Sequence, residues 1–104
     1  MTQPYKFIVT VELVPGTRDE VLARAPELQS ATRAENGCLS FDCFTCTDDP
    51  NRLAFIESWQ DEHAYAEHLL RDHTQRFLEF YEPFHRSFTF ETITAETSCA
   101  IQSL

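Results

Sequence analysis

The order in which two residue periodicities follow one another along the chain constrains its fold most strongly. In some segments apolar residues recur at every second position, as in a half-buried strand, and in others at every third or fourth position, as in an amphipathic helix. These segments run strand, helix, strand, strand, helix, strand. This order predicts the split βαβ arrangement of the α+β class, in which a four-stranded antiparallel sheet carries its helices on one face.

The predicted strands are bounded by turn residues. In the first strand, apolar residues from Phe7 to Leu13 alternate with polar ones until the dipeptide Pro15-Gly16 ends the pattern. The second and third strands are separated by the turn-rich segment 47–51 and are predicted to form a hairpin. The four strands are expected at residues 5–13, 38–46, 52–59 and 86–94.

The first helix contains a proline. This helix is predicted from residue 17 or 18 to about residue 36, because Val21, Ala25 and Leu28 recur at helical spacing. Pro26 has no N–H, and its ring clashes with the preceding helical turn. We therefore predict a kink or a break near Ala25.

Two further helical segments follow the third strand. Asp61 is a predicted N-cap for a helix that runs through Leu70. Another helix is predicted to begin near Asp72, and Pro83 is expected to distort its last turn. Its apolar stripe consists of Phe77, Phe80, Tyr81 and Phe84.

Length and charge restrict the organisation and the partners of the chain. Its 104 residues are expected to form a single domain over 1–104, with the core at about 5–94 and a tail at 95–104. The formal charge of −9 opposes contact with phosphate backbones and anionic lipid headgroups, so neither nucleic acid nor a membrane is an expected partner. The apolar stretches are too short to span a bilayer, and the first residues lack the layout of a signal peptide. The expected location is the cytoplasm.

The cysteines are predicted to be reduced thiols with a structural role. Cys43 and Cys46 form a CxxC sequence, but a spacing of three in a strand directs two side chains to opposite faces. No second CxxC supplies the remaining ligands of a zinc site. Cys38 and Cys99 complete the set, and a chain without a secretion signal is expected to keep its thiols reduced.

Apolar residues occupy both faces of the predicted sheet. Helices can cover only one face, and monomers rarely leave a large apolar patch in water. We therefore predict a homodimer that forms through the sheet faces. The pairs of residues on opposite faces are Phe7 and Ile8, Phe41 and Phe44, Phe55 and Ile56, and Phe90 and Ile93.

Common cofactor and hydrolase motifs are absent. Gly16 and Gly37 are the only glycines, which excludes the glycine-rich loops that bind dinucleotides and nucleoside triphosphates. The sequence also lacks GxSxG and HExxH. The chemistry must therefore rest on individual side chains.

Three histidines recur five residues apart at His63, His68 and His73. On one helix this spacing separates neighbouring side chains by about 140°, so a shared metal ion is not expected. His68 is predicted to face inward as a catalytic or a hydrogen-bonded core residue, whereas His63 is predicted to be solvated. His73 is expected in a linker or at a helix start.

Three residues in the second half of the chain combine a polar group with a position suited to a pocket. Trp59 and Tyr65 each carry a polar group that needs a partner when it is buried. Glu57 alternates in phase with Phe55 and Trp59, so it is expected on their face, paired to a histidine or an arginine.

Several short motifs occur in a diagnostic order. Segment 35–41 reads E-x-G-C-x-x-F, Glu57 and Trp59 form an E-x-W on the third strand, and His68 is followed five residues later by His73. Together these elements resemble the antibiotic biosynthesis monooxygenase domain family. The match runs from about Phe7 to Thr94.

The resemblance implies a ferredoxin-like protomer that dimerises through its sheets into an α+β barrel, with a small pocket between each sheet and its helices. Several members of this family oxygenate phenols or hydroquinones with dioxygen and use neither metal nor flavin, so no cofactor and no metal are expected. Relatives that degrade haem carry Trp at the position of His68 and Asn on the first strand. This chain has neither, so haem is not expected either.

Residue roles carry over from the family at matching positions. His68 would be the base or proton shuttle, and the other two candidate catalytic residues, Trp59 and Tyr65, would orient the substrate ring. The candidate substrate-binding residues are Glu57, Phe77, His73 and Phe55, with Phe77 as an apolar wall.

Three functions are therefore compatible with the sequence. The first is a cofactor-independent monooxygenase that acts on a small phenolic or quinol substrate. The second is an isomerase of a small carbonyl metabolite, in which His68 moves a proton and no oxygen is consumed. The third is a non-catalytic dimer that either binds a small ligand or is purely structural, and a pocket filled by the protein's own aromatic side chains would favour it.

Overall fold

The computed structural model describes residues 3–94, and within them the predicted order of elements is confirmed. The predicted tail at 95–104, which includes Cys99, lies outside the described residues. The elements are β1 (Tyr5–Leu13), α1 (Arg18–Arg33), β2 (Cys38–Thr45), β3 (Arg52–Trp59), α2 (Glu62–Leu70), α3 (Asp72–Tyr81), the short 3₁₀ helix η1 (Glu82–Phe84) and β4 (His85–Thr92).

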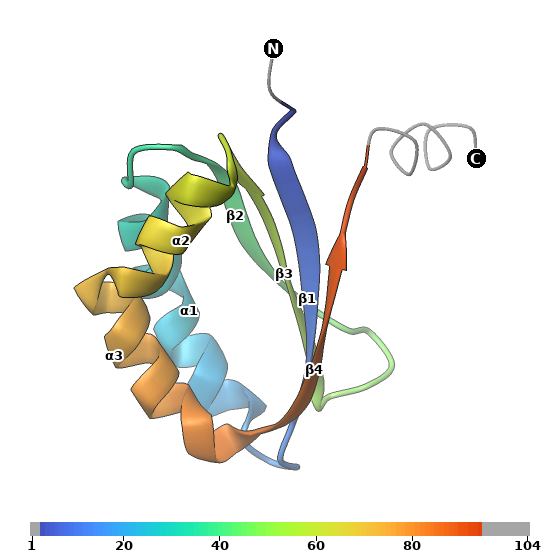
Figure 1. Ribbon diagram of the computed structural model, residues 1–104. Coiled ribbons are helices and arrows are strands. Elements are labelled where there is room, and N and C mark those ends of the chain that lie inside the picture. Colours follow the sequence, from blue (N-terminus) through green and yellow to red (C-terminus); the bar gives the residue numbers. More distant parts are fainter. Residues whose placement is uncertain (1–2, 95–104) are drawn as a thin grey trace.

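The four strands form one antiparallel sheet in the order β2-β3-β1-β4. The helices all lie on one face of this sheet, and the opposite face carries no helix of the described chain (Figure 1). The predicted α+β class and its split βαβ topology are therefore confirmed. The structure is a two-layer domain in which the core lies between the helices and the sheet.

Strand alternation decides which side chains enter that core. On β1, Phe7, Val11 and Leu13 face the helices and are at most 2% exposed. Val9 shares this face and is aligned with Phe55 of β3. Every second residue of the two central strands is therefore available to line a site between the layers.

Helix α1 is continuous from Arg18 to Arg33, so the predicted break near Ala25 is wrong. Pro26 lies on the exposed side of the helix, while Ala25 and Leu28 on either side of it are buried. On the exposed side the ring meets no packed neighbour, and water can satisfy the carbonyl that loses its intrahelical partner.

The turn after α1 brings the chain very close to α2. Gly37 has φ +94°, a conformation that glycine adopts most readily, and a Cβ at this position would lie 2.7 Å from the Cβ of Ala64. Its carbonyl also accepts a hydrogen bond of 2.8 Å from the backbone N–H of Gln60. Gly37 thus fixes the turn that contains Glu35 against the start of α2.

Two predicted boundaries on the helical side are confirmed. Asp61 caps α2, because its carboxylate accepts a hydrogen bond of 2.8 Å from the N–H of Ala64. The last turn before β4 contains Pro83 and is a 3₁₀ helix, which is the distortion that the sequence predicts.

Helices α2 and α3 are separated by a single extended residue. Arg71 is both the C-cap of α2 and the N-cap of α3, with φ −70° and ψ 147°. The chain therefore changes direction between His68 and His73, and the two histidines belong to different helices.

The helix-free face of the sheet carries a mixture of apolar and polar side chains. Ile8 of β1 and Ile56 of β3 are direct cross-strand neighbours on this face, and both are half-buried. Phe44 at the end of β2 is 48% exposed. Among the helices of residues 3–94, none has the length and apolar character that crossing a membrane requires.

Candidate active site

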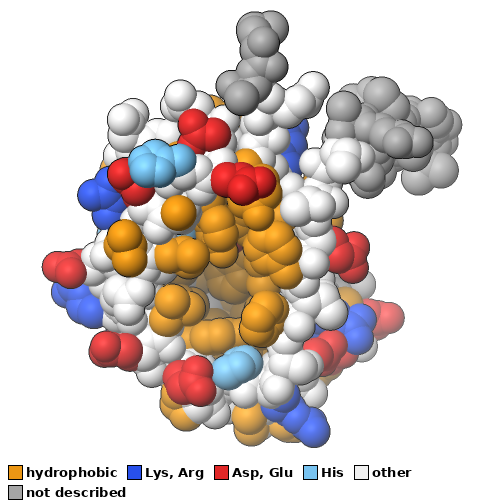
Figure 2. Space-filling view, viewed as in Figure 1, with side chains coloured by type: hydrophobic (Ala, Val, Ile, Leu, Met, Phe, Trp, Pro, Cys, Tyr) orange, Lys and Arg blue, Asp and Glu red, His pale blue; other side chains and the backbone are white. Residues whose placement is uncertain are grey.

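A cavity of about 140 Å³ lies between the sheet and the helices. The space-filling view shows a hollow with an apolar rim between the helix layer on the left and β4 on the right (Figure 2). The polar side chains that line the cavity are Glu57, Tyr65, His68 and Thr74. The apolar ones are Val9, Leu28, Phe41, Phe55, Leu69 and Phe77.

His68 is the central polar residue of this cavity. It projects from α2 towards the sheet and is 4% exposed. Its ring centroid lies 4.7 Å from that of Trp59 and 5.7 Å from that of Phe41. The ring of Tyr65 stacks on it at 6.1 Å. Aromatic rings thus hold the imidazole in a nearly water-free position.

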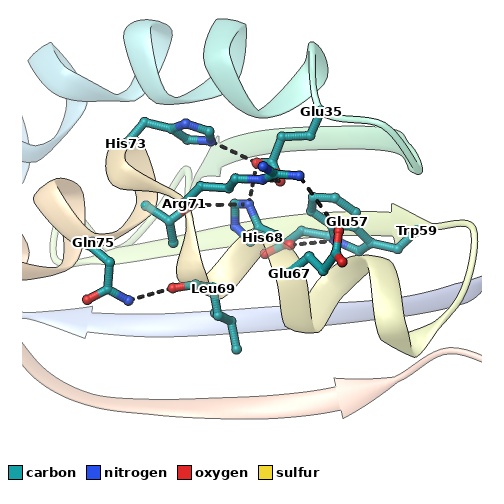
Figure 3. A network of polar contacts seen from close by, with 10 residues as sticks. Glu35, Glu57, Trp59, Glu67, His68, Leu69, Arg71, His73 and Gln75 are labelled. Carbon is teal, nitrogen blue, oxygen red and sulfur yellow. Dashed lines mark hydrogen bonds and ion pairs between the residues drawn. The ribbon is translucent and has the colours of Figure 1, made fainter.

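A buried carboxylate, Glu35, binds this imidazole from the opposite side. Its side chain is 5% exposed, and its Oε2 lies 2.6 Å from His68 Nδ1 and 2.7 Å from His73 Nε2. The guanidinium of Arg71 lies 3.6 Å from the other carboxylate oxygen. Figure 3 shows the two histidines, from α2 and α3, both pointing towards Glu35.

The position of Glu35 corrects the spacing argument on the histidines. A separation of about 140° applies to residues of one helix, but the chain turns at Arg71 between His68 and His73. Their ring centroids are 6.1 Å apart, and both rings contact the same carboxylate oxygen. The helical spacing argument therefore does not apply to this pair of histidines.

The contact with Glu35 determines how His68 can act. A carboxylate oxygen only accepts hydrogen bonds, so Nδ1 of His68 carries the hydrogen. The hydroxyl of Thr74 lies 3.2 Å from the same nitrogen. Nε2 is then left as the acceptor in the neutral ring, and it makes no hydrogen bond with the residues that the structure describes. His68 itself lines the cavity.

Burial lowers the pKa of His68 below its ordinary value of 6.5. Loss of solvation disfavours the charged imidazolium, and this effect outweighs the opposing influence of Glu35. The imidazole is therefore neutral at physiological pH, which is the protonation state that a general base needs.

Glu57 lies on the buried face of β3, as predicted, but its partner differs from the expected histidine or arginine. Its Oε1 accepts a hydrogen bond of 2.9 Å from the indole N–H of Trp59. Burial raises the pKa of Glu57 to about 7, and the negative charge of Glu35 acts in the same direction. Near neutral pH this carboxyl group can therefore both donate and accept a proton.

The structure places the predicted aromatic residues at different distances from the cavity. Phe55, Tyr65 and Phe77 line it, whereas Trp59 does not. Trp59 is 0% exposed and contacts both Glu57 and His68. Trp59 therefore positions two residues of the cavity, Glu57 and His68, without lining the cavity itself. Burial raises the pKa of Tyr65 to about 12, so its phenol stays protonated at neutral pH.

His73 faces a second, larger hollow of about 340 Å³ between α1 and α3. Arg24 and Arg76 also line this hollow, and Leu28 and Phe77 form a wall that it shares with the cavity. His73 therefore reaches the site through Glu35 and does not line the cavity itself.

The CxxC cysteines have no part in this site. Cys43 packs against the core, and burial raises the pKa of its thiol to about 11. Cys46 lies beyond the end of β2, and its thiol contacts the carboxylate of Asp48 at 3.0 Å. A thiol with a raised pKa is a poor nucleophile, which agrees with the structural interpretation of Cys43.

Glu35 is the residue of the site that sequence reasoning missed. It lies in an irregular turn, where neither strand nor helix periodicity assigns a direction to a side chain. One available signal was the E-x-G-C motif, because the glycine two positions later fixes the turn against α2. The turn on its own gave no sign that the carboxylate lies in the site.

A comparison with protein families matches residues 4–79 to the model described as Antibiotic biosynthesis monooxygenase. The match ends before β4. A protein of Bacillus subtilis (strain 168), "Putative monooxygenase YcnE", is 32% identical to this chain over 68 residues, which are 65% of this chain and 72% of that protein.

Solved structures agree over a larger part of the chain. A crystal structure of an antibiotic biosynthesis monooxygenase shares 30% identity and a TM-score of 0.81, and the alignment covers 88% of this chain and 97% of that one. PA3566 from Pseudomonas aeruginosa shares 27% identity and a TM-score of 0.82, over 88% of this chain and 93% of that one.

Proposed function

Because the chain belongs to the antibiotic biosynthesis monooxygenase family, we propose that it oxygenates a small phenolic or quinol substrate with dioxygen. The observation that carries this proposal is the neutral, buried His68, which lines an apolar cavity and is oriented by Glu35. Phenol oxidation by dioxygen needs a base for the hydroxyl proton, a dry site and an electron-rich ring.

In the proposed reaction, Nε2 of His68 accepts the hydroxyl proton of the substrate. The resulting phenolate is electron-rich and supplies the electrons that reduce dioxygen, so the reaction needs neither metal nor flavin. One oxygen atom enters the ring as a carbonyl, the substrate loses two hydrogens in total, and the second oxygen atom leaves as water. Protonated Glu57 on the facing strand can return a proton to the departing oxygen.

The size and lining of the cavity restrict the substrate class. The apolar lining favours a flat ring, and Phe55 and Phe77 offer edges and faces for aromatic contacts. A volume of about 140 Å³ suits a single small ring better than a large polycyclic compound. Glu57 in the cavity and Glu35 beside His68 disfavour a substrate with a negatively charged substituent near His68.

One observation favours a second function. Glu57 and His68 are two acid–base groups in a single cavity, which is the arrangement that proton transfer next to a carbonyl requires. An isomerase of a small carbonyl metabolite would use both groups and consume no oxygen. The open cavity argues against a purely structural protein, because its aromatic side chains leave space unfilled.

We also propose that two copies of the chain associate through the helix-free face of the sheet. Ile8, Ile56 and the exposed Phe44 offer apolar contacts on this face, which none of the described helices covers. Sheet packing would leave the cavity on the opposite face of each sheet intact.

The function is tested by oxygen consumption of metal-stripped protein with a panel of hydroquinones and phenols. Uptake that requires folded protein and is lost in His68→Gln supports the oxygenase. Proton exchange into a carbonyl substrate without oxygen uptake supports the isomerase instead. Heat-denatured protein subtracts the spontaneous oxidation of the substrates.

A further inference from the structure

Glu35, His68 and His73 bring together a set of donor atoms that the proposed reaction does not fully use. The donor atoms of the three side chains, one oxygen and two ring nitrogens, all lie within 4.8 Å of one another. Two of these side chains are almost completely buried, at 5% exposure each. The reaction needs only one hydrogen bond, from His68 to Glu35, and leaves the convergence of His73 unexplained.

We propose that Glu35, His68 and His73 bind one divalent first-row transition-metal ion, with Zn²⁺ and Fe²⁺ as the leading candidates. Two imidazoles and one carboxylate, with the remaining positions open to water, are the donor set of catalytic zinc sites and of non-haem iron sites. Imidazole nitrogen selects such ions over Ca²⁺ and Mg²⁺, which prefer oxygen ligands.

The present distances are close to those that an ion requires. Donors bound at about 2.0–2.2 Å in a tetrahedral site lie about 3.3 Å from one another. Oε2 of Glu35 now lies 2.6 Å from His68 Nδ1 and 2.7 Å from His73 Nε2. These two distances would have to lengthen by about 0.6–0.7 Å, and the donor atoms of the two histidines already lie within 4.8 Å of each other, so shifts of this size would admit an ion.

Access and charge are compatible with binding. The side chain of His73 is 25% exposed, so an ion can reach the cluster from the hollow between α1 and α3. Arg71 is the opposing influence, because its guanidinium lies 3.6 Å from Glu35. This side chain is 47% exposed and has Glu67 as a second partner at 3.7 Å, so it can move away from an incoming cation.

Metal binding would change the tautomer of His68. A ligand nitrogen carries no hydrogen, so coordination through Nδ1 moves the hydrogen of the neutral ring to Nε2. The nitrogen available to the cavity then becomes a donor and can no longer accept a proton. This consequence concerns the ring itself and is measurable without any substrate, so it stands or falls independently of the proposed function.

The test is a titration of the metal-stripped protein with Zn²⁺ by calorimetry and with Co²⁺ by its visible absorption. We expect one ion per chain. Glu35→Gln and His73→Gln should each abolish binding or weaken it by more than the loss of about 10- to 100-fold that follows removal of an outer-shell partner. Arg71→Gln should strengthen it, because the variant removes the guanidinium that lies 3.6 Å from Glu35. His63→Gln is the matched control, since His63 is 81% exposed and pairs with Glu67 on the outer side of α2.

Nitrogen-15 NMR of the histidine rings provides a second readout. The metal-free protein should show His68 with its hydrogen on Nδ1, and Zn²⁺ should move it to Nε2. Should Glu35→Gln fail to fold, His73, whose side chain is 25% exposed, provides the variant that decides. Equal affinity in wild-type, His73→Gln and His63→Gln proteins would overturn the proposal, and so would an unchanged His68 tautomer at saturating Zn²⁺.

Discussion

Oε2 of Glu35 lies 2.6 Å from Nδ1 of His68, although the two residues are 33 positions apart in the sequence. One comes from the turn after α1 and the other from the last turn of α2. Their contact fixes the tautomer of the imidazole and leaves its second nitrogen as the acceptor of a residue that lines the cavity. The base of the proposed reaction therefore depends on a turn that contributes no residue to the lining of the cavity.

Replacement of Glu35 by glutamine should impair oxygen uptake while the cavity remains. The amide keeps the shape of the side chain but can donate a hydrogen bond, so it no longer enforces the tautomer of His68. We expect a loss of about 10- to 100-fold in kcat, which is less than the contribution of about 10²- to 10⁴-fold by the general base itself, because the variant disturbs the orientation of His68 and does not remove it. Glu12→Gln, which alters an exposed pair with Arg52, is the matched control and should retain full activity. Equal rates in both variants would remove Glu35 from the mechanism.

Gly37→Ala should destabilise the protein more than Gly16→Ala. Both glycines have positive φ, but a Cβ at Gly37 would lie 2.7 Å from Ala64, whereas the space around Gly16 is open. The backbone cost is about 1 kcal/mol at either position. Overpacking adds about 1–3 kcal/mol at Gly37 alone. Urea denaturation of the two variants measures the difference, and equal destabilisation would show that α2 does not press on the turn.

The raised pKa of Glu57 predicts that the free energy of unfolding depends on pH. Its pKa in the folded protein is raised to about 7 from an ordinary value of 4.5, so the folded state holds the proton more tightly than the unfolded state. This contribution to stability is complete below pH 4.5 and is lost as the pH rises through about 7. Glu57→Gln has no charge to bury and still accepts the hydrogen bond from Trp59. Between pH 5 and pH 8 wild-type protein should therefore lose on the order of 2 kcal/mol more stability than the variant.

His68 makes the opposite contribution to stability and does not disturb this comparison. Its folded-state pKa is lowered, so its contribution is present above pH 6.5 and is lost as the pH falls below that value. Because both proteins contain His68, the difference between their denaturation curves reports Glu57. Parallel losses of stability in the two proteins would contradict the raised pKa.

The helix-free face of the sheet predicts the oligomeric state. Sedimentation should show a particle of twice the 12.1 kDa chain mass at micromolar concentration. Ile56→Lys places a charge in the centre of this face and should dissociate the dimer. Leu70→Lys on the exposed side of α2, where the leucine is 78% exposed, is the control and should leave the mass unchanged. A compact particle of 12.1 kDa in the wild-type protein would contradict the sheet-to-sheet dimer.

The sequence predicts the fold well because the hydrophobic periodicity agrees with the positions of the capping and turn residues along most of the chain. The Asp61 cap, the strand alternation from Phe7 to Leu13 and the distortion at Pro83 all lie where local rules place them. The predicted break at Pro26 is wrong because the effect of a proline depends on which side of the helix faces the sheet. A sequence pattern gives that orientation only approximately.

The candidate site was only partly predictable from the sequence. His68 and Glu57 follow from periodicity, which places them on buried faces of α2 and β3. The partner of Glu57 depends on a contact two residues along the same strand, and the role of Glu35 depends on packing between distant segments. Such tertiary contacts produce no periodic pattern in the sequence. Only the structure therefore reveals that His68 and His73 both contact the carboxylate of Glu35.

Oxygen uptake by metal-stripped wild-type protein and by His68→Gln is the most direct test of the proposed activity. His68→Gln is preferred to His68→Ala because alanine would leave a void beside Trp59 and would remove the hydrogen bond from His68 to the carboxylate of Glu35. The account predicts enzyme-dependent uptake with at least one small phenol or hydroquinone, and a loss of about 100-fold or more in the folded variant. Uptake that is equal in the variant, or that never exceeds the heat-denatured control across the panel, would contradict it.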